Sequence, residues 1–460
     1  MPRECLRGAV AVLALAGVLA WGEGAWAAGI QLFDQGPSGQ GEAYAGAGAV
    51  AEDASTVFFN PAGMTELNGY QTAGGLQIIA PSGTFRPSVA RTAPLAGTGA
   101  ASVPLTGPGN RDFGETVVVP NAYLVAPLTD DLRAGFGLGV PFGLVTDYGN
   151  NSWIGRYYAE RTALTTVNAN PSLAYKVADW LSLGAGADVM HADAQLTNAV
   201  DFGSICTNAA GAGACSLFGL APQANDGQVS LTASDTTASW NMGAMLQPLE
   251  HTRIGLAYRS SYNLHLGGTA VFATPAAYRT LQAAIPAFGG NFTTTGARAN
   301  ITLPATASLS LDQGLSERWT LLADVSWTQW SSFKNLIVTF SNPLQPAEVI
   351  PENWHDTLRE SLGLIYAPND KSKLRLGVAY DPTPTKAATR TFLVPDDTRI
   401  WLSVGYNLQL MEHLSLDAAY THLFIPGGSK VSLSNANQGA ITGTFSSAVN
   451  VFALGLKYQF

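Results

Sequence analysis

The chain has 460 residues and a net charge of −9; 12% of its residues are charged, 47% are hydrophobic and 49 are glycine. Charged residues make up about a quarter of an ordinary soluble protein, so this share is about half the usual one. The acidic balance provides no basic surface of the kind that binds nucleic acid, and we expect no nucleic-acid partner.

The first residues are typical of a secretory signal peptide. Arg3 and Arg7 accompany a short apolar run over residues 8–21, and an A-x-A cleavage motif follows at 25–27. The apolar run is shorter than the roughly 20 residues that a membrane helix needs, and no later segment reaches that length. We therefore predict that residues 1–27 are a signal peptide and that the protein is exported.

Residues 28–68 differ from everything that follows them. Small residues dominate GQGEAYAGAGAV, and the next stretch, AEDASTVFFNPAGM, has neither the alternation of a strand nor a clear helical stripe. Small residues allow a backbone to pack closely in a confined space, and Asn60-Pro61 favours a turn. We predict that this segment folds as a plug inside the structure that the later residues build.

From residue 69 onward, tight turns join runs in which apolar and polar residues alternate. With a first strand near 69–85 and a last one near 447–460, the turns predict fourteen strands. Long connections lie at the opposite strand ends, which indicates an all-β, 14-stranded antiparallel transmembrane β-barrel over residues 69–460, with long extracellular loops, in the bacterial outer membrane. A soluble β-sandwich would alternate too, but it would not sort its loops by length. The six turns lie near residues 129, 179, 250, 316, 369 and 411.

Two cysteines, Cys206 and Cys215, lie in one of the long loops. An exported pair so close in sequence predicts a loop disulfide. Neither a histidine nor an acidic cluster accompanies the pair, so we expect no metal site there, and nothing in the sequence calls for a cofactor.

The segment GIQLFDQGPSGQGEAYAGAGAVAEDASTVFFNPAGMTEL resembles the N-terminal hatch of the long-chain fatty acid transporter family of outer membrane proteins, which includes toluene-type aromatic hydrocarbon channels. Asn60, Pro61 and Ala62 match the hatch motif of that family, and PFGLVTDY (141–148) and WHDTLRESLGLIY (354–366) match along the barrel. The resemblance covers essentially the whole exported chain. It implies a fourteen-stranded barrel with a hatch, which agrees with the strand count above, and passive uptake of hydrophobic molecules.

The resemblance also implies a route. Long extracellular loops capture the ligand, a pocket above the hatch receives it, and a gap beside an inward kink in the third strand releases it sideways into the membrane. The candidate kink is Pro141, Phe142 and Gly143, because proline cannot donate a ladder hydrogen bond and glycine tolerates unusual dihedral angles. The alternative is that the strand simply ends there.

The sequence offers several candidates for the residues that would contact the ligand. Fatty acid members of the family are expected to hold the carboxylate with basic residues, and the nearest counterparts here are Asp193 and His355. Asp193 would repel a carboxylate and His355 is mostly neutral at pH 7, whereas Arg359 and Arg156 could substitute. The alternative for His355 is an interfacial or lumen residue that contacts no ligand, so a fatty acid and a neutral hydrocarbon are both retained as candidate substrates.

A second set of candidates lies in a long loop over residues 274–288. Tyr278, Leu281, Ile285 and Phe288 recur there at helical spacing and predict a short amphipathic helix. This helix could present its apolar face to a ligand, or it could pack only against the loop at 198–230.

Three other functions are compatible with an exported β-barrel. A general diffusion porin would need a polar constriction and no plug, and an adhesin or receptor leaves no particular mark in the sequence. An enzyme would need a nucleophile–base–acid set, and His191 beside Asp193 has no matched serine. We expect a monomeric channel that is not an enzyme. Its partners would be hydrophobic small molecules, outer membrane lipid with lipopolysaccharide, and the barrel-assembly machinery through Phe460.

Overall fold

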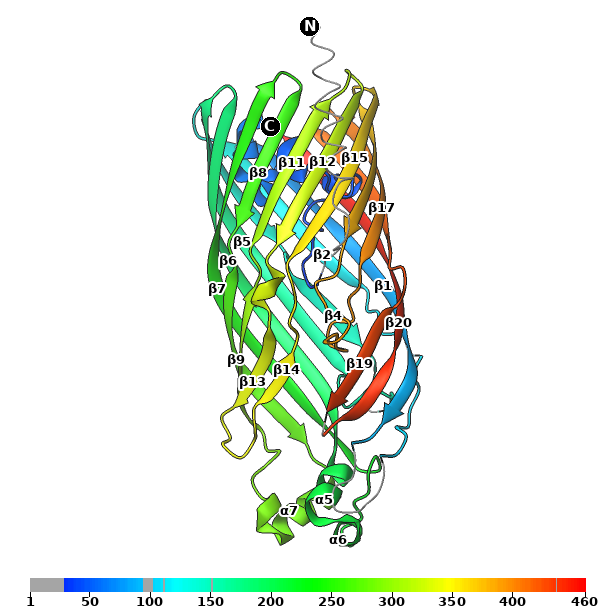
Figure 1. Cartoon of the computed structure of the whole chain (residues 1–460). Helices are drawn as coiled ribbons and strands as arrows, with labels where there is room; N and C mark the ends of the chain where they lie inside the picture. The colour runs from blue at the N-terminus through cyan, green and yellow to red at the C-terminus, as the bar shows by residue number, and fades with distance from the viewer. Residues whose placement is uncertain (1–28, 94–101, 111, 150–151, 436) are drawn as a thin grey trace.

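The computed structural model describes residues 29–93, 102–110, 112–149, 152–435 and 437–460 (Figure 1). The predicted signal peptide lies outside these residues. None of the helices in the described ranges is both long and apolar enough to span a bilayer.

The described chain forms one closed antiparallel barrel, in which each strand pairs with its neighbours in sequence (Figure 1). β1 (Gln71–Arg91) pairs with β20 (Gly439–Gln459) and so closes the wall. The 20 strand segments correspond to fourteen wall strands, because six of the wall strands are each divided into two segments. The predicted number of strands is confirmed.

Eight wall strands are continuous and six are divided. Besides β1 and β20, the continuous strands are β2 (Val117–Pro127), β5 (Arg161–Ala178), β6 (Leu181–Asp201), β7 (Asp226–Leu249), β16 (Ser372–Asp381) and β17 (Arg399–Met411). The divided strands are β3 (Leu132–Gly139) with β4 (Gly143–Asp147), β8 (Thr252–Arg259) with β9 (Tyr262–Ala273), β10 (Thr295–Leu303) with β11 (Thr306–Gly314), β12 (Trp319–Thr328) with β13 (Asn335–Phe340), β14 (Glu348–Pro351) with β15 (Thr357–Asn369), and β18 (Leu414–Phe424) with β19 (Ser429–Asn435).

Side chains of the wall alternate between an outer apolar face and an inner polar face. On β16, Leu374, Leu376 and Val378 are exposed on the outside, whereas Arg375 and Asp381 are buried on the inside. A charge that faces lipid at mid-depth costs about 2–4 kcal/mol, so the period of two in the sequence sets which face meets the membrane.

Residues 29–67 lie within the barrel, near the end that carries the short turns and the C-terminus (Figure 1). They form the short helices α2 (Pro37–Gln40), α3 (Ala47–Val50) and α4 (Thr56–Phe59) and the 3-10 helix η1 (Pro61–Glu66), which contact inner faces of strands on several sides of the barrel. The wall strands make room with glycine: a Cβ on Gly255 would lie 1.9 Å from the carbonyl oxygen of Gly48.

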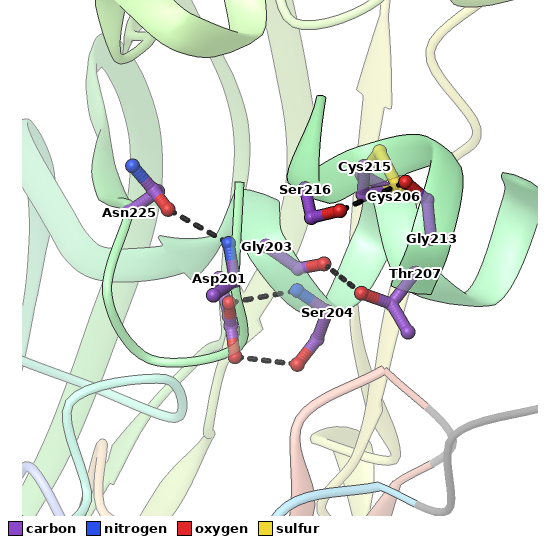
Figure 2. The surroundings of a disulfide bond; sticks show 10 residues. Asp201, Gly203, Ser204, Cys206, Thr207, Gly213, Cys215, Ser216 and Asn225 are labelled. Atoms are coloured by element: carbon purple, nitrogen blue, oxygen red, sulfur yellow. Dashed lines mark hydrogen bonds between the residues drawn. A yellow bond between two sulfur atoms is a disulfide. The ribbon is translucent and has the colours of Figure 1, made fainter. Parts of the chain in front are cut away.

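The long loops carry the remaining helices at the other end of the barrel: α5 (Phe202–Ala210), α6 (Ala212–Ser216), α7 (Ala276–Ala284) and η2 (Pro286–Phe288) (Figure 1). A further 3-10 helix, η3 (Trp330–Ser332), lies between β12 and β13. A disulfide joins Cys206 on α5 to Cys215 on α6, and Asp201 caps α5 by accepting a hydrogen bond from the Ser204 amide (Figure 2).

Candidate ligand cavity and strand break

The third wall strand is interrupted at residues 140–142, between β3 and β4. β4 pairs with β5 on one side. On its other side, residues 117–121 of β2 pair with β1, and no ladder joins them to β4 within the described chain. The wall therefore lacks its regular hydrogen bonds between the second and third strands at this level.

Residues at the start of the inner segment replace the missing strand partners. The Leu32 amide donates to the Pro141 carbonyl at 2.9 Å, and the Gly143 amide donates to the Ile30 carbonyl at 3.0 Å. Pro141 has no amide hydrogen of its own to satisfy. The residues that the sequence indicated as a kink thus mark a real interruption of the ladder.

Two polar side chains complete this arrangement. The Gln35 side-chain amide donates to the Val140 carbonyl at 2.6 Å and accepts from the Val140 amide at 3.1 Å. The Thr166 hydroxyl accepts from the Phe142 amide at 3.2 Å and donates to the Phe142 carbonyl at 2.5 Å. Buried backbone groups need such partners, so the break is held in place. Sequence reasoning missed Gln35 and Thr166, for which no local pattern gives a signal.

An apolar cavity lies inside the barrel next to this break, with a volume of about 960 Å³ including its open mouth. Its wall is drawn from the inner faces of many strands, from the inner segment and from the loop that follows β16. The large apolar residues that line it are Ile30, Leu144, Leu164, Leu196, Leu231, Leu264, Leu266, Ile301, Leu303, Trp330, Phe333, Leu336, Val338, Trp354, Leu393 and Val394.

One acidic side chain, Glu352, lines the apolar cavity from the connection between β14 and β15. It is 1% exposed. Its two oxygens accept from the Trp354 indole at 2.8 Å and from the Thr391 hydroxyl at 3.2 Å. Sequence reasoning did not select this residue.

The prediction that Asp193 lies on the inner face of the wall is wrong. Its side chain is 68% exposed on the outer face of β6, where it pairs with His191. The inward residue beside it, Ala194, lines the apolar cavity instead. The alternation of β6 carries the missed signal, because Leu183 and Val189 are exposed and place the odd-numbered residues outside.

Arg359 and His355 lie outside the lining of the apolar cavity. Arg359 on β15 is buried, donates to the Ala43 carbonyl at 2.8 Å and lies over the rings of Phe33 and Trp401. His355 is half-buried in the connection before β15. Neither residue lines the apolar cavity, but Arg359 lines a separate cavity together with Pro141 and Phe142 at the strand break. Ligand contact at Arg359 and His355 therefore stays a prediction.

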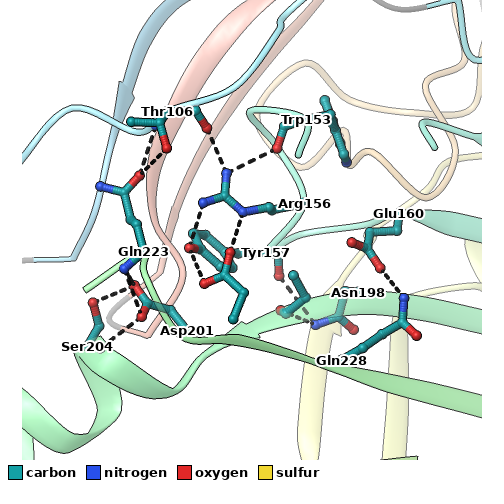
Figure 3. A network of polar contacts seen from close by, with 12 residues as sticks. Thr106, Trp153, Arg156, Tyr157, Glu160, Asn198, Asp201, Ser204, Gln223 and Gln228 are labelled. Carbon is teal, nitrogen blue, oxygen red and sulfur yellow. Dashed lines mark hydrogen bonds and ion pairs between the residues drawn. The ribbon is translucent and has the colours of Figure 1, made fainter. Parts of the chain in front are cut away.

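Arg156 belongs to a polar network that includes Thr106 and Tyr157 (Figure 3). Its Nε lies 2.7 Å from Asp226, and it also donates to the Thr106 carbonyl and to the Tyr157 hydroxyl. These contacts hold the loop that carries Trp153 against β7, so Arg156 has a structural partner for its charge.

The helix expected over 274–288 forms as α7 and η2. Tyr278, Leu281 and Phe288 are buried against Phe202 and the Cys206–Cys215 disulfide, and Ile285 is partly buried against the same cluster. Tyr278 and Phe288 also line a larger extracellular cavity, of about 2,290 Å³ including its mouth. Leu393 lines both this cavity and the apolar one, so the two adjoin. Packing against the 198–230 loop is therefore observed, and ligand contact stays a prediction.

Asn60, Pro61 and Ala62 fix the inner segment to the wall. The Asn60 side chain donates to the carbonyls of Gly48 and Ala244 at 2.7 and 3.1 Å and accepts from the Ala62 amide at 3.1 Å. Pro61 begins η1, where a missing amide hydrogen costs nothing. The motif therefore joins two parts of the inner segment to β7.

A buried ion cluster makes the second attachment. Arg375 on β16 binds Glu42 at 2.7 Å and Glu52 at 2.6 Å, and Lys373 binds Glu52 at 2.8 Å. Both carboxylates come from the inner segment. The alternation of β16 predicts that Arg375 faces inward, but its carboxylate partners in the inner segment could not be predicted from that pattern.

These features define a class: an outer membrane β-barrel whose interior holds a folded N-terminal segment and an apolar cavity. A family model described as "Outer membrane protein transport protein (OMPP1/FadL/TodX)" matches residues 18–460. The chain belongs to this family. It is thus a transport protein of the outer membrane, in agreement with the predicted family and location.

Individual relatives agree with this assignment. The chain is 28% identical over 452 residues to the long-chain fatty acid transport protein of Escherichia coli O6:H1, covering 95% of each chain. The crystal structure of a Pseudomonas aeruginosa FadL homologue matches with a TM-score of 0.82 and 25% identity, over 94% of this chain and 100% of that one. The Ralstonia pickettii toluene transporter TbuX matches in fold, with a TM-score of 0.63 and 20% identity over 93% and 100% of the two chains.

Replacing Asn60 with alanine should loosen the inner segment. The change removes a cap and the side-chain donor to the buried Gly48 carbonyl, which costs about 1–3 kcal/mol. Hydrogen–deuterium exchange over residues 40–66 should become faster, and small-ion conductance in a planar bilayer should rise. The exposed Asn68→Ala serves as the control. Exchange and conductance equal to those of the unmodified protein would contradict the anchoring role.

Proposed function

We propose that the protein carries hydrophobic compounds passively across the outer membrane. The observation that supports this most is the apolar cavity, whose lining includes Ile30 and Leu144 on either side of the hydrogen bond that holds the strand break. The Escherichia coli relative is named for long-chain fatty acids, which is the same broad class of molecule.

Passive movement follows from the nature of the cavity. Each CH₂ group that leaves water gains about 0.8 kcal/mol. A ligand can therefore move from the extracellular cavity to the apolar cavity and onward into lipid without an energy source. A water-filled pore would keep the ligand hydrated and would remove this driving force.

We propose that residues 28–68 act as a hatch within the barrel of residues 69–460, and that the break at Pro141, Phe142 and Gly143 is the lateral exit. The pairing of the Ile30 and Leu32 backbone with the break supports this, because a shift of the hatch would change the exit. Capture at Tyr278 and Phe288, with Leu281 and Ile285 as support, fits the extracellular cavity that the first two line.

General diffusion of polar solutes is the weaker proposal. Ala43, Ala45, Ala49, Ala54 and Ala62 of the inner segment are fully buried against the wall or one another. A polar solute would have to displace this packed segment together with the ion pairs of Arg375.

The route is tested by replacing Pro141, Phe142 and Gly143 with Val, Thr and Val. A regular strand would then pair with β2, and uptake of a hydrophobic probe by cells that lack other transporters of this class should fall at least fivefold. A small polar sugar, which the proposed route does not carry, serves as the control solute. Unchanged uptake of the hydrophobic probe by the variant would exclude the lateral route, and no uptake by the unmodified protein would exclude the function.

We propose that lipopolysaccharide binds the outer wall at Arg86 and Lys430. Both side chains are exposed and both lie opposite Thr444, on the two strands that flank β20. Strand spacing places their backbones about 10 Å apart. Neither forms an ion pair with an acidic residue of the described chain, so both can bind phosphate groups of the lipid headgroup.

The double variant Arg86→Ser/Lys430→Ser should retain at most half as much lipopolysaccharide through detergent purification as the unmodified protein. Arg318→Ser/Lys371→Ser removes two exposed charges at the short-turn end and is the matched control. Equal retention by both double variants would count against a specific site.

We propose that the barrel-assembly machinery recognises Phe460. Its ring is 58% exposed and stacks on Tyr70, and its amide and carbonyl pair with the Tyr70 backbone at 3.0 Å. Phe460→Ala should lower the amount of folded, heat-modifiable monomer in the outer membrane severalfold. Phe452→Ala, which removes another exposed ring from the same strand, should have little effect. Equal amounts of folded monomer from the two variants would contradict recognition of Phe460.

A further inference from the structure

We infer that the apolar cavity selects uncharged ligands, and that Glu352 is the residue that excludes those carrying a carboxylate. The inference rests on the proposed function and narrows its substrate class to neutral chains, such as long-chain alcohols, esters or hydrocarbons.

The charges around the apolar cavity carry the inference. Only Arg298 and Glu352 are charged among the residues that line it. Arg298 is exposed on β10, where its neighbours Ala297 and Ala299 are turned inward, so its cation lies on the outer face. Glu352 is therefore the charged group that the cavity presents to a ligand.

Two other buried cations nearby are each paired with a carboxylate. Arg259 forms a buried ion pair with Asp188 and donates to the Phe58 carbonyl at 2.9 Å. Arg156 binds Asp226 at 2.7 Å. Arg359 forms no ion pair within the described residues, but it lines the separate cavity with Pro141 and Phe142, not the apolar cavity, and donates to the Ala43 carbonyl. A carboxylate in the apolar cavity would meet none of these charges.

A carboxylate without a cation is strongly disfavoured in apolar surroundings. Glu352 adds to this effect, because a second carboxyl group nearby disfavours ionisation of the first. An uncharged ligand avoids both costs. A ligand hydroxyl can also donate to Glu352 when the side chain is ionised, or accept from it when it is protonated.

The hydrogen bonds of Glu352 give it a fixed position. Trp354 and Thr391 hold its two oxygens, and the Thr389 hydroxyl donates to its carbonyl at 2.6 Å. These bonds tie the loop that carries Leu393 and Val394 to the cavity wall. Since Glu352 also has this structural role, its test must compare two ligands rather than measure one affinity.

The test measures equilibrium binding of hexadecanol and palmitate to the purified protein at pH 8, by displacement of a fluorescent probe. The two ligands have the same chain length, and palmitate is ionised at this pH. We expect hexadecanol to bind at least tenfold more tightly. Glu352→Gln, which keeps the size and an acceptor for Trp354, should reduce this ratio severalfold. Thr391→Val, which removes a hydrogen bond but keeps the charge, should leave it unchanged.

Ala194→Lys provides a gain-of-function arm, because Ala194 lines the cavity and the substitution supplies the missing cation. It should raise the affinity for palmitate at least tenfold without strengthening hexadecanol binding. Palmitate binding as tightly as hexadecanol to the unmodified protein would overturn the inference and leave the proposed function intact. An unchanged ratio in Glu352→Gln would overturn the role of Glu352, and no binding of either ligand would overturn the proposed function itself.

Discussion

A membrane-spanning wall must satisfy every backbone hydrogen bond from within the protein. Closure between β1 and β20 meets this requirement around most of the barrel. At residues 140–142 the ladder stops, and Gln35, Thr166 and the backbone of the inner segment supply the missing partners. The break and the inner segment therefore form one structural unit, and neither can be understood without the other.

The same alternation of side chains builds two different interiors. Near the short turns, inward positions carry Arg375 and Lys373, which bind carboxylates of the inner segment. Toward the long loops, inward positions such as Leu231, Leu264 and Leu303 form the apolar cavity. Polar solutes meet paired charges and packed alanines, whereas apolar solutes meet a surface that favours them.

The sequence predicted those features that depend on local periodicity. Turn spacing gave the fourteen strands, and helical spacing gave the helix around Tyr278. Features that depend on distant partners could not be predicted this way: Gln35 meets Val140, and Glu352 meets Thr391. The misplacement of Asp193 has another cause, because one step in strand register exchanges the two faces of the wall. The exposed Leu183 and Val189 fix that register once β6 is known.

Three buried arginines of this protein each lie beside an opposite charge, which stabilises an ion that has left water. Arg259 has Asp188, Arg156 has Asp226, and Arg375 has Glu42 and Glu52. A ligand carboxylate would have to displace one of these partners and leave it buried without a cation. An uncharged ligand would displace none of them, so the pairing that holds the inner segment and the loops in place supports the inference that the cavity between them takes neutral molecules.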